Sequence, residues 1–366
     1  MCECVACLSW TSRNRTSLHP NEQIKTKERN LIVTQERYSR QILFKEIGSD
    51  GQDKINDSHV CIIGMGALGT HLAEGLTRAG VSELTIVDRD YIEYSNLQRQ
   101  TLFTEQDAEM ATPKVIAAKR ALTEIRHDLT VRAHIAHVDA YFLEQHVQDV
   151  DLILDATDNF ETRQLVNDFA YQQRIPWIYG AVVESTYVEA AFIPGQTPCF
   201  NCLMPQLPVI NRTCDTVGVI QPAVTMTTSL QLRDALKILT GQPVQTKMTY
   251  GNLWEGSHHT IGFTKLQRET CQTCGTHPTF PHLDETQRQF ASLCGRDTVQ
   301  YQNDHISQEM LKEFLESHQM NYQSNPYMIR FQYKGYRIVS FNSGRLLIHG
   351  TTRPAEAVTL INQLFG

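Results

Sequence analysis

The chain has 366 residues, of which 41% are hydrophobic and 20% are charged, a composition typical of a globular protein. It is longer than the roughly 250 to 300 residues at which a single hydrophobic core stops growing, so we expect two domains. A formal net charge of -7 disfavours general binding to nucleic acid or to a membrane surface, because both depend on a cationic face.

Residues 1–34 are polar and without hydrophobic periodicity, so we predict a disordered extension there. Cys2, Cys4 and Cys7 have no fourth ligand nearby, which favours an incidental cluster over a metal site. No apolar run approaches the ~18 residues that cross a bilayer, and no signal peptide is recognisable. Ten cysteines, several of them in CxxC pairs, fit a reducing compartment. We expect a soluble cytoplasmic protein.

From Tyr38 onward the pattern alternates between strands and helices. A short helix is expected around residues 40–44. Strands are then expected at 59–66, 83–88, 129–135, within 150–159 and at 175–183, and helices at 67–80, 112–125 and 160–174. This alternation predicts an α/β fold, a Rossmann-like, doubly wound and mostly parallel sheet.

The rhythm changes beyond Glu189, where loops rich in Pro and Cys precede a helix at 226–241 and further strands up to Cys274. Residues 276–290 resemble a linker. The last part of the chain predicts a small α+β domain at 291–366, with a hairpin that turns at Asn342, Ser343 and Gly344. We therefore place the main domain at residues 35–280.

A nucleotide site is predicted where the first strand meets its helix. Gly64, Gly66 and Gly69 form a GxGxxG motif there, and Asp88 ends the next strand. Glycines let the backbone approach a phosphate, the helix N-terminus attracts it, and the acid accepts hydrogen bonds from ribose hydroxyls. The motif by itself fits dehydrogenases, methyltransferases and nucleotide-binding scaffolds equally.

More specific are the polar residues expected at the same edge of the sheet. Asn96 and Arg99 follow Asp88, Lys114 begins the next helix, and Asp158 with Asn159 follows the fourth strand. Two cations and a carboxylate suit a triphosphate with Mg²⁺, since Arg and Lys neutralise phosphate oxygens and a carboxylate holds the metal. A nicotinamide cofactor needs none of these, although the glycines and Asp88 also permit an NAD-dependent oxidoreductase.

Two CxxC pairs, Cys199 with Cys202 and Cys271 with Cys274, could supply four thiolates to a structural zinc ion. The zinc would clip the C-terminal half of the main domain. A redox-active pair is the alternative, but such a motif normally opens a helix, whereas the first pair lies between prolines.

Seven segments together resemble a known family: RYSRQILF, GMGALG, VDRDYIEYSNLQRQ, TPK, DATDNFETR, TCDTVGVIQPAV and the pair CFNC and CQTC. They are similar to the adenylyltransferases that activate ubiquitin-like sulfur carriers, the HesA/MoeB/ThiF family related to ubiquitin-activating enzymes. The resemblance runs from about Gln35 to Gly275. Its two nearest branches are the molybdopterin-synthase and the thiazole-biosynthesis adenylyltransferases.

The resemblance implies an activity and a set of site residues. ATP would be attacked at its α-phosphate by the C-terminal glycine carboxylate of the carrier, giving an acyl adenylate and pyrophosphate. The residues implied to bind the nucleotide are Gly64, Gly66, Ala67, Gly69, Asp88, Ser95, Asn96, Leu97, Gln98, Arg99, Lys114, Asp158 and Asn159, with Asp158 holding Mg²⁺.

Two further residues acquire roles only through the resemblance. Arg40 would reach across a homodimer to the ATP of the partner, and Cys214 would join the activated carrier through sulfur, although a free Cys is by default a small buried hydrophobe. A sulfur donor such as a cysteine desulfurase is then a further expected partner. A non-catalytic carrier-binding scaffold and a tRNA-modifying cyclase of the same superfamily remain alternatives.

Overall fold

A computed structural model of the chain describes residues 36–204, 217–284, 290–293, 298–302 and 307–365. Over these residues the chain forms one eight-stranded and one six-stranded sheet. Within the described residues no helix combines the length and the apolar character needed to cross a membrane.

The eight-stranded sheet has the order β3-β2-β1-β4-β5-β6-β7-β8. Its first five strands are parallel: β1 (His59–Ile63), β2 (Glu83–Asp88), β3 (Thr130–Ile135), β4 (Leu152–Asp155) and β5 (Trp177–Val183). Three antiparallel strands extend it: β6 (Thr186–Phe192), β7 (Lys247–Asn252) and β8 (His259–Gly262). The predicted mostly parallel sheet is confirmed.

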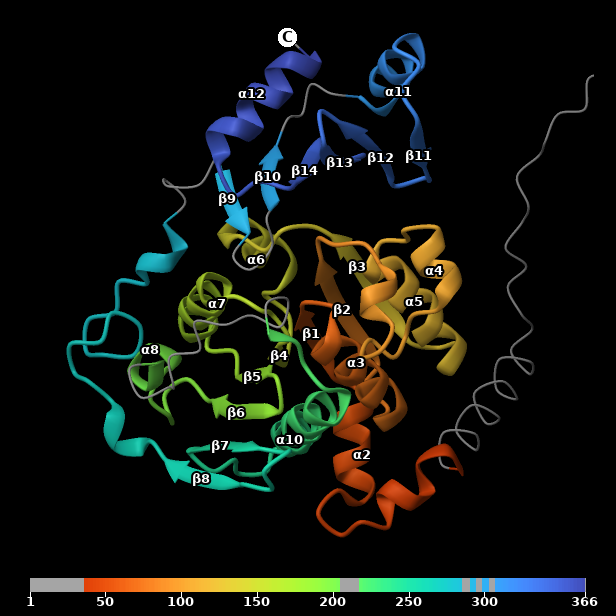
Figure 1. Cartoon of the computed structure of the whole chain (residues 1–366). Helices are drawn as coiled ribbons and strands as arrows, with labels where there is room; N and C mark the ends of the chain where they lie inside the picture. The colour runs from red at the N-terminus through yellow and green to blue at the C-terminus, as the bar shows by residue number, and fades with distance from the viewer. Residues whose placement is uncertain (1–35, 205–216, 285–289, 294–297, 303–306, 366) are drawn as a thin grey trace, which may run out of the picture.

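Helices cover both faces of this sheet (Figure 1). One layer contains α2 (Gly48–Asn56), α3 (Ala67–Ala79), α5 (Lys114–Ile125) and α10 (Gln221–Thr240), and the other contains α6 (Ala140–His146) and α7 (Phe160–Gln173). Side chains of β1 alternate between the two cores, because Val60 and Ile62 join the first and Cys61 and Ile63 the second. A strand buried on both faces explains the unbroken apolar run in the sequence.

Several helices differ from the sequence prediction, α2, α6 and α10 among them. α2 and α6 were not expected, and α10 begins at Gln221 rather than at residue 226. The sequence of α2 is mostly polar, with only Gly51, Gln52 and Ile55 buried, so its helical state depends on packing against α10. Pro222 lies in the first turn of α10, where its missing N–H has no intrahelical partner to lose.

The six-stranded sheet is antiparallel, with the order β11-β12-β13-β14-β10-β9. Its strands are β9 (Phe290–Leu293), β10 (Thr298–Gln302), β11 (Tyr322–Ser324), β12 (Met328–Tyr333), β13 (Tyr336–Phe341) and β14 (Arg345–His349). With α11 (Gln308–Ser317) and α12 (Pro354–Phe365) it makes what we call the C-terminal unit. The predicted hairpin turn at Asn342 to Gly344 joins β13 to β14 as expected, with Gly344 at φ 77°.

The C-terminal unit packs against the segment that follows β2 (Figure 1). Tyr91 of that segment lies in one apolar cluster with Phe341 and Leu347 of the unit. Arg337 forms an ion pair with Glu93 at 2.9 Å, and the Asn325 Nδ2 donates to the Met110 carbonyl at 3.0 Å. The C-terminal unit therefore packs against the segment between Asp88 and Arg99 and restrains it.

Candidate nucleotide site and cysteine cluster

The loop between β1 and α3 is fixed by close backbone contacts. Gly64 has φ +94°, and a Cβ added there would lie 2.6 Å from the Ala156 carbonyl oxygen, just past β4. A Cβ added at Gly69 would lie 2.0 Å from the Gly64 oxygen. Neither position admits a larger residue without movement of the backbone. The ends of β1 and β4 and the start of α3 therefore meet at one point.

Gly66 differs from its two companions, because a Cβ there would meet only the Gln100 Nε2, at 3.8 Å. It is the N-cap residue of α3 and makes no side-chain cap, so the helix N-terminus is open at this point. An open helix N-terminus beside a glycine is a site for phosphate. The predicted Ala67 begins the helix.

Asp88 ends β2 with both carboxylate oxygens occupied. The Met65 N–H donates to Oδ2 and the Asp90 N–H donates to Oδ1, each at 2.7 Å. These bonds tie the end of β2 to the glycine loop and fix the carboxylate at the same edge. A carboxylate oxygen can still accept a further hydrogen bond from a ribose hydroxyl.

Lys114 is the first residue of α5 and is only 3% exposed. Its Nζ lies 3.3 Å from Asp90 Oδ2, and its backbone N–H donates to the Asp90 carbonyl at 3.0 Å. The structure thus confirms that Lys114 and the end of β2 come together. It also adds Asp90, a counter-ion that the sequence did not single out.

The segment from Ser95 to Arg99 forms the short helix η1 (Tyr94–Asn96) and a turn. The Asn96 side chain is buried and caps η1 by accepting from the Glu93 N–H at 3.0 Å. Arg99 donates to the Ser95 carbonyl at 2.8 Å, while Ser95 and Gln98 are exposed and Leu97 packs against the first core. Asn96 therefore shapes this segment whether or not it contacts a nucleotide.

Asp158 is exposed and lies three residues past the end of β4. Asn159 caps α7, since its Oδ1 accepts from the Thr162 N–H at 2.8 Å. The strands β2, β1 and β4 are neighbours, so Asp88, the glycine loop and Asp158 share the carboxyl edge of the sheet, as the sequence predicted.

Two buried residues at this edge, Gln100 and Arg163, were not among the site residues that the sequence predicted. Gln100 is 3% exposed, lies over Gly66, and its Oε1 is buried without a hydrogen-bond partner. Arg163 is buried, donates to Asp155 Oδ2 at 2.9 Å and to the Thr157 carbonyl at 2.6 Å, and so fixes the turn before Asp158. Both lie in segments that carried the family resemblance, which was the available signal.

Arg40 and Cys214 are not brought to this edge by the described structure. Cys214 lies outside the described residues. Arg40 is exposed on helical residues 36–42, and its neighbour Gln41 donates to the Ala79 carbonyl at 2.8 Å, at the far end of α3. A 13-residue helix is about 20 Å long, so Arg40 lies far from the glycine loop of its own chain.

The four cysteines of the two CxxC pairs come together. Their Sγ atoms all lie within 4.8 Å of one another, and the two pairs contact each other at 3.5 Å from Cys199 to Cys271 and 3.6 Å from Cys202 to Cys274. Four sulfurs around zinc, each about 2.3 Å from the metal, would be about 3.8 Å apart. The donor set therefore fits tetrahedral Zn²⁺.

One sequence argument about this cluster was wrong. Cys199 is the N-cap of α8 (Phe200–Leu203), so the first CxxC pair does open a short helix despite the flanking prolines. What favours a metal over a redox disulfide is instead the meeting of all four sulfurs. Exposed Arg268 donates to the Asn201 carbonyl at 2.8 Å and hydrogen-bonds Cys202, placing a cation beside the thiolates.

The pKa values of the thiols differ across the cluster. Hydrogen bonding to Cys274 and burial raise the pKa of Cys199. Burial also acts to raise the pKa of Cys271, but the N–H groups of Cys274 and Thr273 donate to its sulfur and lower it to about 7. A thiolate is therefore accessible at neutral pH as a first metal ligand.

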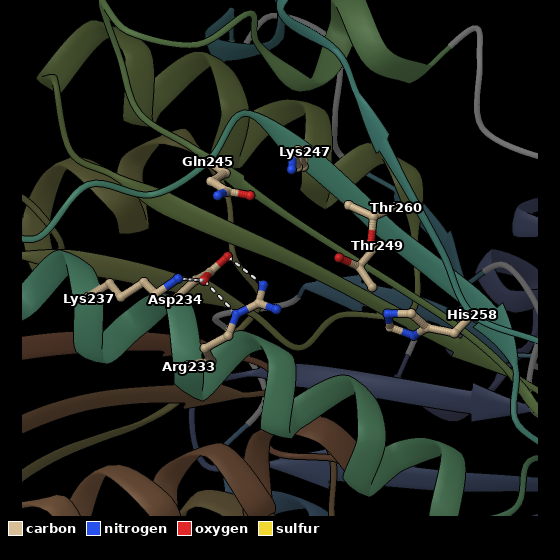
Figure 2. A pocket seen from close by; sticks show the side chains of 8 residues that line it. All are labelled: Arg233, Asp234, Lys237, Gln245, Lys247, Thr249, His258 and Thr260. Atoms are coloured by element: carbon tan, nitrogen blue, oxygen red, sulfur yellow. Dashed lines mark hydrogen bonds and ion pairs between the residues drawn. The ribbon is translucent and has the colours of Figure 1, made fainter. Parts of the chain in front are cut away.

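A separate pocket of about 290 Å³ lies at the β7–β8 end of the sheet (Figure 2). Its charged side chains from α10 pair with one another, Arg233 with Asp234 at 2.8 Å and Lys237 with Asp234 at 3.7 Å. Arg233 also reaches Glu189, a buried residue whose pKa is raised well above its usual value by burial and by Asp234. These mutual pairs compensate much of the positive charge in the pocket.

Comparison with known proteins agrees with this geometry. The ThiF family model matches residues 38–275. The chain is 42% identical, over 90% of its length and 99% of the relative, to the sulfur carrier protein ThiS adenylyltransferase of Bacillus subtilis strain 168. It is 34% identical to the molybdopterin-synthase adenylyltransferase of Escherichia coli strain K12, over 65% of this chain and 96% of that protein.

A solved structure shares the fold of the main part of the chain. The crystal structure of E. coli MccB with ATP matches with a TM-score of 0.57 and 25% identity, covering 65% of this chain and 74% of that one. The chain belongs to the ThiF family.

The glycine loop gives a first prediction. We expect Gly69→Ala to lower the free energy of unfolding by about 1–3 kcal/mol or more, because its Cβ meets the Gly64 carbonyl. Gly66→Ala should unfold like the wild type, yet bind ATP more weakly because its Cβ enters the open space at the helix N-terminus. Urea unfolding and calorimetric titration with ATP measure the two effects. A Gly66→Ala protein that binds ATP normally would contradict this site.

The cysteine cluster gives a second prediction. Freshly purified protein should contain one zinc ion per chain, and Ser at Cys199, Cys202, Cys271 or Cys274 should release it. Stability should fall by several kcal/mol, because metal binding is coupled to folding. Elemental analysis and thermal unfolding test this. A metal-free protein with a disulfide within either CxxC pair would instead support the redox alternative.

Proposed function

We propose that this protein uses ATP to adenylylate the C-terminal glycine carboxylate of a ubiquitin-like sulfur carrier. An oxygen of the carboxylate attacks the α-phosphorus, the bond from that phosphorus to the bridging β-phosphate oxygen breaks, and pyrophosphate leaves. The product is a carrier acyl adenylate ready for sulfur transfer. That the enzyme is an adenylyltransferase follows from its family and its named relatives.

The observation that carries the proposal is the grouping of Asp88, Lys114 and the open N-terminus of α3 at one strand edge. In the proposed site Asp88 binds the ribose, and the backbone at Gly66 and Ala67 approaches the phosphates. Lys114 and Arg99 compensate phosphate charge. Positioning and charge compensation are the main contributions that a protein makes to transfer at phosphorus.

Asp158 is the residue that we propose for Mg²⁺. Its carboxylate is exposed at the same edge, and Arg163 holds the preceding turn in place. Mg²⁺ usually binds one or two carboxylates together with substrate phosphates. The ion would neutralise part of the phosphate charge, while Asp158 and the neighbouring Asn159 determine where it binds.

We favour the thiazole sulfur carrier ThiS over the molybdopterin-synthase carrier. The two ThiS adenylyltransferases among the relatives, from B. subtilis and E. coli, are 42% and 36% identical to the chain, and the E. coli molybdopterin-synthase enzyme is 34% identical. We also propose that Cys214 joins the activated carrier through sulfur. A cytoplasmic location and a cysteine desulfurase as sulfur donor are further parts of the proposal. Since the attacking atom is oxygen, adenylation itself needs no thiol.

Loss of the charged groups tests the nucleotide assignment. We expect Lys114→Ala and Asp158→Ala to fold but to lose carrier-dependent ATP–pyrophosphate exchange by about 100-fold or more, the usual scale for a principal electrostatic group. Lys119→Ala is the matched control, because this lysine is exposed on the same helix, α5. Exchange at the wild-type level in both variants would exclude the proposed site, and reduction of NAD by the wild type would favour the oxidoreductase.

Arg40 tests a second part of the proposal, action across a homodimer. Because it lies at the far end of α3 from its own glycine loop, only another chain could bring this guanidinium to the phosphates. We expect Arg40→Ala to lose exchange activity, with Arg37→Ala, exposed on the same helical segment, as the control.

Subunit mixing then measures the effect directly. Inactive Arg40→Ala and Lys114→Ala proteins are allowed to exchange subunits. Each heterodimer has one site with both residues intact and one with neither, so its activity should approach half that of the wild type. Full subunit exchange without recovered activity would show that Arg40 does not act in the partner's site.

A further inference from the structure

Phe200 lies inside the first CxxC pair, directly after Cys199 and two residues before Cys202. Its side chain is buried, and its backbone N–H donates to the Asn167 Oδ1 of α7 at 2.9 Å. Helix α8 packs against α7 (Figure 1). Phe200 is therefore a residue at which the cysteine cluster, held on both sides of it, meets α7.

Two aromatic rings join Phe200 to a buried arginine. The Phe200 ring centre lies 6.3 Å from that of Phe160, the first residue of α7, and 5.2 Å from that of Tyr179 in β5. The Arg163 guanidinium carbon lies 5.5 Å from the Phe160 ring centre and 5.0 Å from that of Tyr179. These distances are typical of aromatic pairs and of cation–π contacts. Each of these two rings thus contacts both Phe200 and Arg163.

Arg163 holds the turn that precedes Asp158. It pairs with buried Asp155 at 2.9 Å and donates to the Thr157 carbonyl at 2.6 Å. Thr157 also donates to Asp155 from its N–H, at 2.9 Å, and from its hydroxyl, at 2.6 Å. A guanidinium is planar and its donors point in fixed directions, so a rotation of Arg163 would displace these partners. The exposed Asp158 follows Thr157 directly and would move with it.

We propose that Phe200 is a positioning residue of the Mg²⁺ site. It keeps the Phe160 and Tyr179 rings against Arg163, and Arg163 holds the turn from which Asp158 binds the metal. Groups that orient a metal-binding carboxylate commonly set the affinity for the metal. The inference rests on the proposed role of Asp158 and deepens it, because the helix of the first CxxC pair then contributes to nucleotide chemistry as well as to the fold.

Binding of Mn²⁺, a spectroscopic substitute for Mg²⁺, tests the inference without carrier and without turnover. Electron paramagnetic resonance measures how much Mn²⁺ the zinc-loaded enzyme binds in the presence of ATP. In Phe160→Leu we expect the dissociation constant for Mn²⁺ to rise about fivefold, less than the roughly 10- to 100-fold typical of a direct partner of a metal ligand. Phe160→Tyr should stay within about twofold of the wild type, because a tyrosine ring also contacts a cation. Phe160 is 39% exposed, so neither variant should impair folding.

Phe200→Leu separates this linkage from ordinary core packing. It should raise the dissociation constant by a similar factor while the cysteine cluster keeps its metal. Adding Phe160→Leu should raise it by less than the product of the two single effects, because both substitutions interrupt the same contacts. Phe192→Leu is the matched control: its ring also contacts Phe200, at 6.1 Å, but among the described residues its other ring contacts are with Trp177 and Phe263. It should lower thermal stability and leave the affinity for Mn²⁺ unchanged.

An unchanged affinity in Phe160→Leu, or single effects of Phe160→Leu and Phe200→Leu that simply multiply, would overturn the inference. An equal loss in Phe192→Leu would also overturn it, because general packing would then be the cause. If Phe200→Leu does not fold or loses its metal, the comparison of Phe160→Leu with Phe160→Tyr decides. Asp158→Ala is the reference: if the wild type binds Mn²⁺ no better than this variant, the proposed role of Asp158 itself is wrong.

Discussion

Backbone contact between the ends of β1 and β4 is the constraint on which the site depends. Gly64 lies against the Ala156 carbonyl, and Gly69 brings α3 against the Gly64 oxygen. This contact places the N-terminus of α3 at the sheet edge, and from there the Met65 N–H reaches Asp88. A side chain at either glycine would push apart the ends of β1 and β4 and the start of α3, so this arrangement forms only where backbone meets backbone.

The sequence predicted this edge well because the signals were local. An apolar run marked the central strand β1, and the glycine spacing marked the turn into α3. Lys114 and Asp88 were correctly expected near each other, since the carboxyl ends of parallel strands share one edge. The two CxxC pairs were also correctly grouped, because four thiolates form a complete ligand set for structural zinc.

What the sequence did not reveal depends on contacts between distant segments. Nothing local distinguishes Asp90 from other turn-forming acids, and its importance appears only because α5 brings Lys114 to it. Gln100 is one amide in a polar run, and only the fold places it, buried, over Gly66. α2 is too polar to predict from periodicity, and tertiary packing makes it helical.

The remainder of the chain supports the edge from two sides. The cysteine cluster joins residues on either side of α10. Asp168 on α7 accepts a hydrogen bond from Thr273 at 2.5 Å, so the second CxxC pair is also tied to the parallel part of the sheet. The C-terminal unit contacts the segment after Asp88 through Tyr91, Glu93 and Arg89. The loop that carries the proposed ribose and phosphate residues is thus fixed at both ends.

The most direct test of the account is mass spectrometry of the carrier after incubation with this enzyme, ATP and Mg²⁺. We predict an adenylate on the C-terminal glycine of the ThiS carrier, absent when that glycine is deleted. If the folded, zinc-loaded enzyme leaves every ubiquitin-like sulfur carrier unmodified in the presence of ATP and Mg²⁺, the assignment of the strand edge to carrier adenylation is contradicted.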